Sequence, residues 1–179
     1  MPALMRSSLL FLALSPAAFG GMASACDSAP ETRVARAVEF ISIWESRQTD
    51  LLDTITTSGA VYRDTPNLHD YVGADIASYF NHVHGWSDDT RITIQAASAT
   101  PCGAIVEWTV SGIQARAIGD RMPWASNRPW QFEGVTVFSF EDDRISRAVD
   151  YYDVATFMAQ IGFAFHPPVP DPSPEGGPD

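Results

Sequence analysis

The chain has 179 residues, of which 45% are hydrophobic and 11% are aromatic, so it can bury the core of one domain and is hardly long enough for two. Its 11 basic residues are all arginine and stand against 22 acidic residues, which gives a formal net charge of -11 at pH 7. Because the net charge is negative and the arginines form no basic stripe, we expect no nucleic acid among its partners.

The N-terminal segment has the layout of an export signal. Arg6 precedes the apolar run "LLFLAL", which is too short to span a bilayer, and the segment ends on the small residues "ASA" before Cys26. We therefore predict a signal peptide over residues 1–25 and an exported mature chain, either periplasmic or extracellular. Two forms stay open: ordinary cleavage, which leaves a soluble protein, or lipidation of Cys26, which would anchor a bacterial lipoprotein to the membrane. Cys26 and Cys102 could also pair in an oxidising compartment.

Composition also bounds the folded region. Residues 26–33 read as a linker, and residues 166–179, "HPPVPDPSPEGGPD", consist mostly of proline, glycine and acidic residues. Such a segment cannot bury enough apolar surface to order itself, so we predict a disordered, proline-rich tail there. The folded domain is expected over residues 34–165.

Helical periodicity dominates the first part of this domain. Apolar residues recur at helical spacing in "VARAVEFISIWE", "TDLLDTITT" and "GADIASYFNHVH", which predicts three helices. Thr49 or Asp50 is expected to cap the second of them. Between the second and third helices, "AVYRDTP" reads as a short strand that Pro66 ends.

The second part of the domain reads as β-structure. Four segments are rich in β-branched and aromatic residues and alternate in part: "TRITIQAAS", "GAIVEWTVSG", "WQFEGVTVFSF" and "RISRAVDYY". Helices followed by a run of strands predict an α+β domain, in which one curved antiparallel sheet of four or five strands wraps around the three helices. A last short helix is expected at 153–161, capped by Asp153 and closed by Gly162.

In chain order, the segments "VYRDTP", "VGADIASYF", "AIVEWTVSG" and "FEGVTVFSFEDDRISRAVDYYD" resemble the SnoaL-like branch of the nuclear transport factor 2-like superfamily over residues 34–162. The resemblance implies a cone-shaped α+β fold, whose curved antiparallel sheet wraps around three N-terminal helices and encloses an apolar cavity. That superfamily includes polyketide cyclases, ketosteroid isomerases, limonene epoxide hydrolases, dehydratases and members that only bind. The fold alone therefore does not decide the function.

The epoxide hydrolases of the superfamily carry Tyr-x-Asn-x-Pro on the first strand, Arg-x-Asp on the third and an aspartate on the last. Here the first motif reads "YRDTP", with Asp64 for the asparagine, and the last acid falls on Asp150. Strand alternation then turns Asp150 and Tyr152 inward, and Tyr151 and Asp153 outward. The Arg-x-Asp pair falls on "WTV", so we expect no epoxide hydrolysis.

The resemblance implies other residue roles for isomerases and cyclases. Ketosteroid isomerases place their general base where Asp64 stands, but their oxyanion-hole donors fall on Phe40, which cannot donate a hydrogen bond, and on Thr136, a weaker donor than a carboxylic acid. Cyclases rely on an acid at the position of Asp150, and Thr136 replaces their supporting histidine. The cyclase-like interpretation conflicts least with the sequence.

On this resemblance, the predicted catalytic residues are Asp150, Asp64 and Tyr62. The predicted ligand-binding residues are Phe40, Trp44, Trp108, Val110, Phe132, Thr136, Tyr152 and Phe157. Both aspartates also have a purely structural interpretation. Tyr62 or a backbone N–H could hold Asp150 in a polar notch, and Asp64 could be a turn residue before Thr-Pro.

Other aromatic and histidine residues leave further alternatives open. Trp124 and Trp130 lie in the long loop between the third and fourth of the predicted strands, either as a lid over the cavity mouth or packed outside it. His82 and His84 end the third helix at a spacing that cannot chelate a metal from one helix face, so we expect them to interact with the helix dipole. We expect no bound metal and no cofactor.

Two carboxylates in one apolar cavity would repel each other, and together with burial this would raise at least one pKa. One acid could then be neutral and the other charged near pH 7, so that the site could move a proton on a carbon acid or at a leaving hydroxyl. We therefore expect an acid/base enzyme of the cyclase, isomerase or dehydratase type that acts on a small hydrophobic cyclic molecule. Two other classes stay open: a secreted binding protein with the same cavity, and a module that forms a homodimer through the outer face of its sheet.

Overall fold

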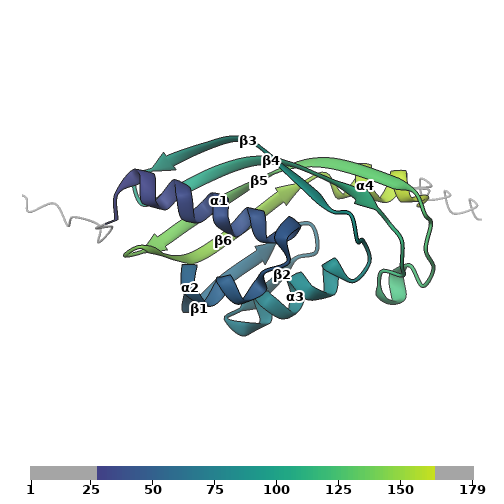
Figure 1. Ribbon diagram of the computed structural model, residues 1–179, viewed down its shortest axis with the longest axis horizontal. Coiled ribbons are helices and arrows are strands. Elements are labelled where there is room, and N and C mark those ends of the chain that lie inside the picture. Colours follow the sequence, from purple (N-terminus) through teal and green to yellow (C-terminus); the bar gives the residue numbers. More distant parts are fainter. Residues whose placement is uncertain (1–27, 164–179) are drawn as a thin grey trace, which may run out of the picture.

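The computed structural model describes residues 28–163 (Figure 1). The predicted signal peptide, Cys26 and the predicted tail therefore lie outside the described residues. The first helix begins at Pro30, inside the segment predicted as a linker. Proline is well suited to the first turn of a helix, where its missing N–H would have no partner anyway.

Four helices and six strands form the described part of the chain (Figure 1). The helices are α1 (Pro30–Ser46), α2 (Leu52–Ile55), α3 (Ala74–His84) and α4 (Val154–Ile161). The strands are β1 (Thr56–Asp64), β2 (His69–Val72), β3 (Arg91–Thr100), β4 (Gly103–Ile113), β5 (Pro129–Glu141) and β6 (Arg144–Tyr152). Short 3-10 turns occupy Thr49–Leu51 and Gly119–Arg121.

All six strands belong to one sheet, in the order β2-β1-β6-β5-β4-β3. The predicted α+β class is confirmed, but the sheet has one strand more than the upper expectation, because β2 was missed. The expectation of a wholly antiparallel sheet is wrong at one place, since β1 and β6 pair in parallel. Alternation within a segment can identify a strand. It cannot identify the parallel partner of β1, because β6 lies more than eighty residues away in the sequence.

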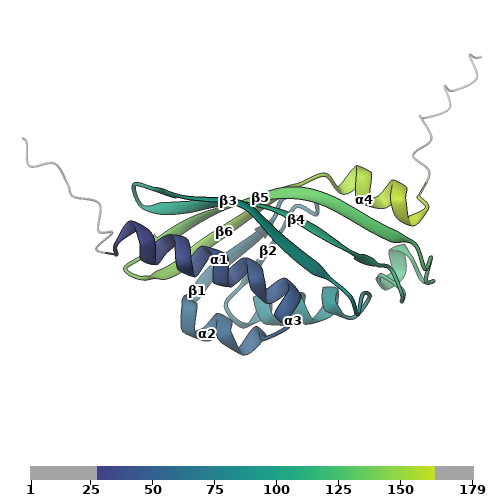
Figure 2. The ribbon, with the colours of Figure 1, turned by 45° about the horizontal axis from the view of Figure 1, so that its top comes forward.

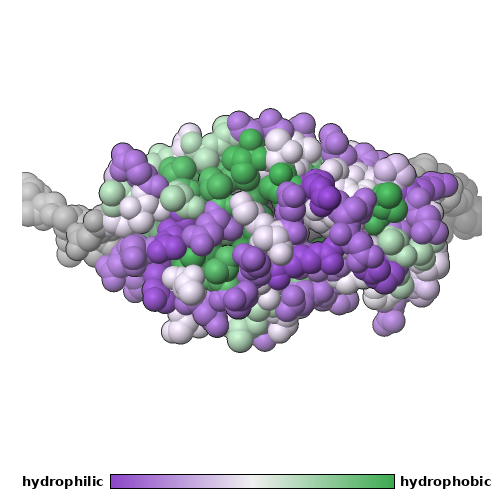
Figure 3. All heavy atoms as spheres, viewed as in Figure 1, coloured by the Kyte–Doolittle hydropathy of each residue, from purple (hydrophilic) through white to green (hydrophobic). Residues whose placement is uncertain are grey.

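The sheet curves around the three N-terminal helices, which lie against one of its faces (Figures 1 and 2). Register shifts interrupt the pairing in β1, β3 and β5, and such irregularities bend and twist a strand. At the centre of the core, the ring of Phe40 packs edge-on against Phe80 at 5.4 Å and Phe138 at 5.5 Å, measured between ring centroids. Hydrophilic residues cover most of the face seen in Figure 3, with smaller hydrophobic patches between them.

Two of the predicted helix starts had different outcomes. No side chain caps α2, which follows directly from the 3-10 turn Thr49–Leu51, so the expected cap by Thr49 or Asp50 is wrong. The cap of α4 is confirmed: Asp153 Oδ1 accepts a hydrogen bond from the backbone N–H of Thr156 at 2.9 Å. α4 ends at Ile161, and the residue that follows it, Gly162, has a φ of 108°, which favours glycine. No helix within residues 28–163 is long and apolar enough to cross a membrane.

Candidate active site

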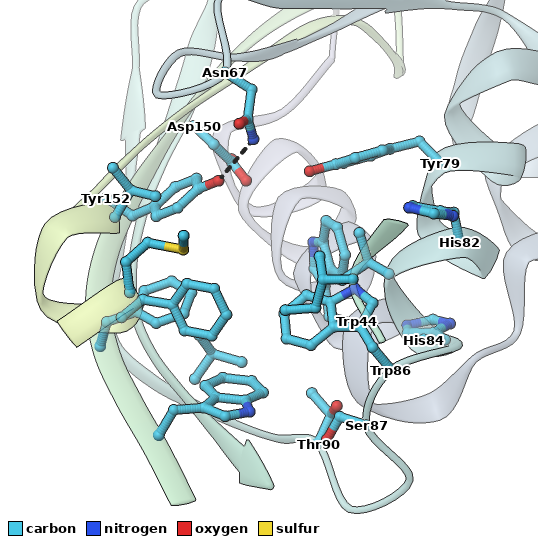
Figure 4. Close-up of a pocket in the computed structure, with 18 of the residues that line it drawn as sticks. Trp44, Asn67, Tyr79, His82, His84, Trp86, Ser87, Thr90, Asp150 and Tyr152 are labelled. Atoms are coloured by element: carbon cyan, nitrogen blue, oxygen red, sulfur yellow. Dashed lines mark hydrogen bonds between the residues drawn. The ribbon is translucent and has the colours of Figure 1, made fainter. Parts of the chain in front are cut away.

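A cavity of about 470 Å³ lies between the inner face of the sheet and the helices α1, α3 and α4. Its wall is mainly aromatic: Trp44, Tyr62, Tyr71, Tyr79, Trp86, Trp108, Trp130, Phe132, Tyr152, Phe157 and Phe163 all contribute. Figure 4 shows Asp150, Asn67 and Tyr152 together at one end of the cavity, and Ser87 and Thr90 at the other. A predominantly apolar wall with a few polar groups is typical of a small-molecule site.

Asp150 on β6 lies at the polar end, and its side chain is bound at both oxygens. Tyr62 Oη donates to Asp150 Oδ2 at 2.6 Å, and Thr136 Oγ1 donates to Oδ1 at 2.5 Å. Trp108 Nε1 in turn donates to Thr136 Oγ1 at 2.8 Å. An indole N–H can only donate, so it directs the hydroxyl proton of Thr136 toward the carboxylate.

Strand pairing explains how these side chains meet. The parallel register of β1 and β6 pairs Asp64 with Asp150, and the antiparallel register of β5 and β6 pairs Thr136 with Asp150. Tyr62 is two residues before Asp64 and therefore points to the same face. The predicted alternation on β6 is confirmed, because Asp150 and Tyr152 line the cavity while Tyr151 is 50% exposed on the outer face.

Burial controls the charge of Asp150, which is only 2% exposed. Loss of solvent raises the pKa of this carboxyl from 3.8 to about 7, because an ionised carboxylate is poorly solvated in the interior. The hydrogen bonds from Thr136 and Tyr62 oppose this rise, and the charge of Asp64 adds to it. Both protonation states of Asp150 are therefore populated near neutral pH.

Asp64 has a different environment from Asp150. It is fully buried, and it is not part of the cavity wall. Its Oδ2 accepts from the hydroxyl of Tyr79 at 2.5 Å and from Asn67 Nδ2 at 2.6 Å, while its Oδ1 accepts from the hydroxyl of Tyr152 at 3.1 Å. Asp64 thus lies behind these three side chains and orients them toward the cavity.

The tyrosines at this end stay neutral. Burial, followed by the nearby carboxylates, raises the pKa of Tyr62, Tyr79 and Tyr152 above the usual value of 10.0. Each phenol therefore keeps its proton and acts as a hydrogen-bond donor to one of the two aspartates. Asn67 Nδ2 also lies 3.4 Å from the hydroxyl oxygen of Tyr152, the contact drawn as a dashed line in Figure 4.

Most of the predicted ligand-binding residues line the cavity. The six that do are Trp44, Trp108, Val110, Phe132, Tyr152 and Phe157. The structure places the other two elsewhere: Phe40 lies in the core between the helices and the sheet, and Thr136 lies behind Asp150. Both residues were predicted because they stand at the positions of the two oxyanion-hole donors of ketosteroid isomerases. Those donors must face the ligand, whereas neither Phe40 nor Thr136 faces the cavity here.

The two tryptophans predicted in the loop between β4 and β5, either as a lid over the cavity or packed outside it, have different positions. Trp130 belongs to β5 and lines the cavity, whereas Trp124 is exposed. Gln114, which is fully buried, holds this loop: its Nε2 donates to the carbonyl of Trp124 at 2.9 Å, and its Oε1 accepts from the backbone N–H of Ser126 at 2.5 Å. The loop thereby contributes Met122 to the cavity wall.

Sequence reasoning missed His84, which the structure places in the cavity wall. The expected interaction with the helix dipole is not its main feature, because the ring is buried beside Trp44 at a centroid distance of 5.9 Å. Burial, and then the charge of Arg47, lowers the pKa of His84 below 6.5. Sequence reasoning also missed Tyr79, Asn67 and Trp86, which line the cavity. Their spacing in the sequence places them in a helix or a loop but does not show that they face the cavity.

Among residues 28–163, no three His, Cys, Asp or Glu side chains are grouped in a way that could hold a metal ion. The polar end of the cavity instead contains the carboxyl of Asp150, and the carboxylate of Asp64 lies behind the wall; neutral donors bind each of them. Such an arrangement can hold, deliver and accept one proton at Asp150.

Comparisons with known proteins agree with this fold. The model of the SnoaL-like domain family matches residues 37–148. Among solved structures, TsrD from Streptomyces laurentii is 17% identical, with a TM-score of 0.66 over 76% of this chain and 98% of its own. A candidate SnoaL-like polyketide cyclase from Jannaschia sp. CCS1 is 13% identical, with a TM-score of 0.65 over 75% and 96%.

A third similar structure is an epoxide hydrolase from M. tuberculosis of the limonene epoxide hydrolase-like type. It is 18% identical, with a TM-score of 0.58 over 74% of this chain and 90% of its own. At such identities the similarity shows the fold and not the activity. A search among curated proteins found no match.

Proposed function

The chain belongs to the family of SnoaL-like domain proteins, whose model matches more than half of it, and on that premise we propose that it is an acid/base enzyme acting on a small hydrophobic cyclic molecule. The family and the fold expected from the sequence are confirmed. The reaction is of the cyclase, isomerase or dehydratase type, and Asp150 transfers the proton.

The observation that carries this proposal is the environment of Asp150. A buried carboxyl with a pKa of about 7 is present in both forms at neutral pH, which suits a general acid/base. Its two hydrogen-bond donors, Tyr62 and Thr136, stabilise the carboxylate, so that the group can ionise in an apolar wall at all.

The proposed step is a proton transfer at one carbon or oxygen of the ligand. The carboxylate of Asp150 accepts a proton from a carbon next to a carbonyl group, and the resulting carboxylic acid returns it to another atom of the same ligand. For a dehydration, the protonated form donates to a leaving hydroxyl instead. The apolar wall excludes water, which strengthens the electrostatic interactions of the reacting groups.

Asp64 is assigned a positioning role and not a second catalytic one. Its four hydrogen bonds come from Asn67, Tyr79 and Tyr152, which leaves this carboxylate shielded from the cavity. It fixes the orientation of two phenols that line the site. Its negative charge also helps to raise the pKa of Asp150.

Two related activities fit the cavity less well. On β4 the inward residues are Trp108 and Val110, so this strand supplies neither the acid nor the arginine that the epoxide-hydrolase motif requires. The two oxyanion-hole positions of the isomerases hold Phe40 and Thr136, and neither lines the cavity. The usual mechanisms of these two enzyme types are therefore not proposed.

The test uses the exchange of carbon-bound hydrogens, because it needs no knowledge of the natural substrate. The probe is β-tetralone, a bicyclic ketone, incubated with the protein in deuterated buffer and followed by NMR. We expect the wild-type protein to accelerate exchange, and Asp150→Asn to slow it by about a hundredfold or more. Asp153→Asn is the matched control and should exchange as fast as wild type, because asparagine also caps a helix.

The outcomes separate the candidate functions. Full activity of Asp150→Asn together with loss in Asp153→Asn would show that the wrong carboxylate was chosen. Equal rates for all three proteins and for buffer alone would favour the alternative function, a binding protein without turnover. The aromatic wall of the cavity favours that alternative over a purely structural role.

A homodimer through the outer face of the sheet is part of the proposal. On that face, the cross-strand pairs Val135–Tyr151 and Val137–Val149 lie side by side; Tyr151 is 50% and Val137 37% exposed, whereas Val149 is buried. Exposed apolar side chains that lie close together favour association. Sedimentation equilibrium of wild type and Tyr151→Glu tests it: a wild-type monomer would contradict the proposal.

We also propose that the chain is exported and oxidised. Cys102, at the turn between β3 and β4, is disulfide-bonded, and the sequence has one other cysteine, Cys26, outside the described residues. A sulfur in a disulfide cannot also carry a lipid thioether, which favours a soluble exported protein over a lipoprotein. Intact-mass measurement decides: reduction should add two hydrogens, whereas an attached diacylglycerol would contradict the proposal.

A further inference from the structure

We propose that Trp108 is a positioning residue for the proton that Asp150 exchanges: acting through Thr136 it closes Oδ1, so that the proton binds at Oδ2, on the side of Tyr62. The inference rests on the proposed function for the role of Asp150 as the acid/base group. It deepens that proposal, because it specifies which oxygen of the carboxyl exchanges the proton. Trp108 itself exchanges none.

Two hydrogen bonds in series close the Oδ1 side of Asp150. Trp108 Nε1 donates to Thr136 Oγ1 at 2.8 Å, and Thr136 Oγ1 donates to Asp150 Oδ1 at 2.5 Å. All three residues are buried. Among residues 28–163, Asp150 is the one acceptor that the Thr136 hydroxyl reaches, so this hydroxyl has nowhere else to direct its proton.

The bond from Trp108 makes the direction of this series fixed, because an indole N–H can only donate. A hydroxyl oxygen has one proton and two lone pairs, and Trp108 occupies one lone pair of Thr136. If Oδ1 of Asp150 carried the proton, Thr136 would have to accept it with the other lone pair. Its own proton would then point to a buried place without an acceptor. An unsatisfied buried donor is costly, so Oδ1 stays unprotonated.

The Oδ2 side of Asp150 is not fixed in this way. Tyr62 Oη donates to Oδ2 at 2.6 Å, and within the described part of the chain the phenol oxygen of Tyr62 accepts no hydrogen bond. A phenol hydroxyl can accept as well as donate. When Oδ2 gains a proton, Tyr62 therefore accepts from it and turns its own proton away from Asp150, on a side chain that lines the cavity.

The sheet holds Trp108 in the orientation that this role requires. Trp108 on β4 is directly opposite Gly134 on β5, and Thr136 follows two residues later on the same inner face. A Cβ on Gly134 would lie 2.4 Å from Trp108 Cη2 and 2.5 Å from Cζ2, so only glycine leaves room for the indole ring to cross β5 there. The ring thereby brings its Nε1 to Thr136.

Asp150 is the group expected to titrate near neutral pH at this place. The titratable side chains that face it are Tyr62 and Asp64 from β1 and Tyr152 from its own strand. Burial raises the pKa of both tyrosines, so neither ionises there, and the partners of Asp150 on β4 and β5 do not titrate. Burial, with the charge of Asp64 adding to it, raises the pKa of Asp150 to about 7.

The Oδ1 side is tested by 15N NMR of the indole N–H groups, which needs no turnover. Ionisation of Asp150 strengthens the bond from Thr136, and this polarises the bond from Trp108. One of the five indole signals of the wild type should therefore shift with a midpoint near pH 7, be absent from Trp108→Phe and stay constant in Asp150→Asn. Signals that move in both wild type and Asp150→Asn report other groups, such as His84 beside Trp44.

Infrared difference spectroscopy identifies the oxygen that carries the proton. The C=O band of protonated Asp150 is the one that Asp150→Asn removes at mildly acidic pH, and a hydrogen bond to a carbonyl oxygen lowers its frequency. If Oδ2 carries the proton, Oδ1 is the carbonyl oxygen. Thr136→Val should then raise the frequency, and Trp108→Phe should raise it by less. Thr136→Ser, which keeps the hydroxyl, and Tyr62→Phe should leave it close to the wild-type value.

The pH dependence of tetralone exchange links Trp108 to the proposed reaction. Trp108→Phe should move the midpoint of this dependence to higher pH, because a weaker bond from Thr136 stabilises the carboxylate of Asp150 less. Val110→Ala is the matched control, since it trims the same strand of the cavity wall without removing a polar group. It should leave the midpoint in place, whatever its effect on the rate.

Different results overturn this inference and the proposed function. A rise of the C=O frequency in Tyr62→Phe with none in Thr136→Val would place the proton on Oδ1. An unchanged set of indole shifts through pH 7 would show that Thr136 does not connect Trp108 to Asp150. That titration needs only the wild type and Asp150→Asn, and thermal unfolding checks that each variant is folded. Absence of tetralone exchange would count against the proposed function alone, since the NMR and infrared measurements need no turnover.

Discussion

Replacement of Asp150 by asparagine should change how the stability of the protein depends on pH. In the folded protein the pKa of Asp150 is about 7, against 3.8 for an ordinary aspartate. The folded state therefore holds this proton over a range in which the unfolded chain has already lost it. The stability that this proton contributes is fully present below pH 3.8 and is lost as the pH rises through about 7.

The size of the effect follows from the two pKa values. At about 1.4 kcal/mol per pH unit, the difference between 3.8 and about 7 corresponds to about 4 kcal/mol. Asparagine does not titrate, and its amide fits between Thr136 and Tyr62 much as a protonated carboxyl does. The free energy of unfolding of Asp150→Asn, minus that of wild type, should therefore rise by about 4 kcal/mol between about pH 4 and pH 8.

Urea unfolding of both proteins at a series of pH values measures this difference, because the contributions of groups that do not interact with Asp150 cancel. Asp153→Asn is the control with the opposite sign: hydrogen bonds from Thr156 lower the pKa of Asp153, so its variant should lose stability relative to wild type as the pH rises through the acidic range. A difference between Asp150→Asn and wild type that stays constant with pH would refute the assignment of a buried, protonated carboxyl.

Three further substitutions test the site and its support. Thr136→Val removes a hydrogen bond that lowers the pKa of Asp150, so it should raise this pKa further and move the pH dependence of tetralone exchange to higher pH. Gly134→Ala would drive a Cβ into the Trp108 ring, and urea unfolding should show a loss of about 1–3 kcal/mol. Asp153→Ala should cost about 1 kcal/mol in the same assay through loss of the α4 cap, whereas Asp153→Asn at neutral pH should cost much less.

Much of the fold could be predicted from local patterns. Helical spacing marked α1 and α3, and β-branched residues marked β3 to β6, because these features depend on residues only a few positions apart. β2 was not predicted, because it is only four residues long. Three of these residues, His69, Asp70 and Tyr71, are polar or aromatic and at least partly exposed, so they show no alternation of apolar and polar side chains. Its existence depends on pairing with β1, which its own sequence does not reveal.

The candidate site was predicted less completely. The inward direction of Asp150 and Tyr152 followed from alternation on one strand once one face was assigned. The resemblance also predicted Phe40 and Thr136 as ligand-binding residues. In the structure Phe40 packs in the core, and Thr136 donates a hydrogen bond to Asp150 from behind. His84 could not have been found by pattern, because a histidine near the end of a helix most often serves the helix terminus or solvent.

By itself, the sequence determined most of the helices and strands, the cap at Asp153 and the fact that Asp150 and Tyr152 share one face of β6, since each depends on neighbours within one helix or strand. Only the tertiary structure decided which partners meet. Tyr62 reaches Asp150 across 88 positions because β1 and β6 pair in parallel. The charge of Asp150 was decided in the same way, because a pKa depends on burial and on the donors that strands remote in sequence bring to one place.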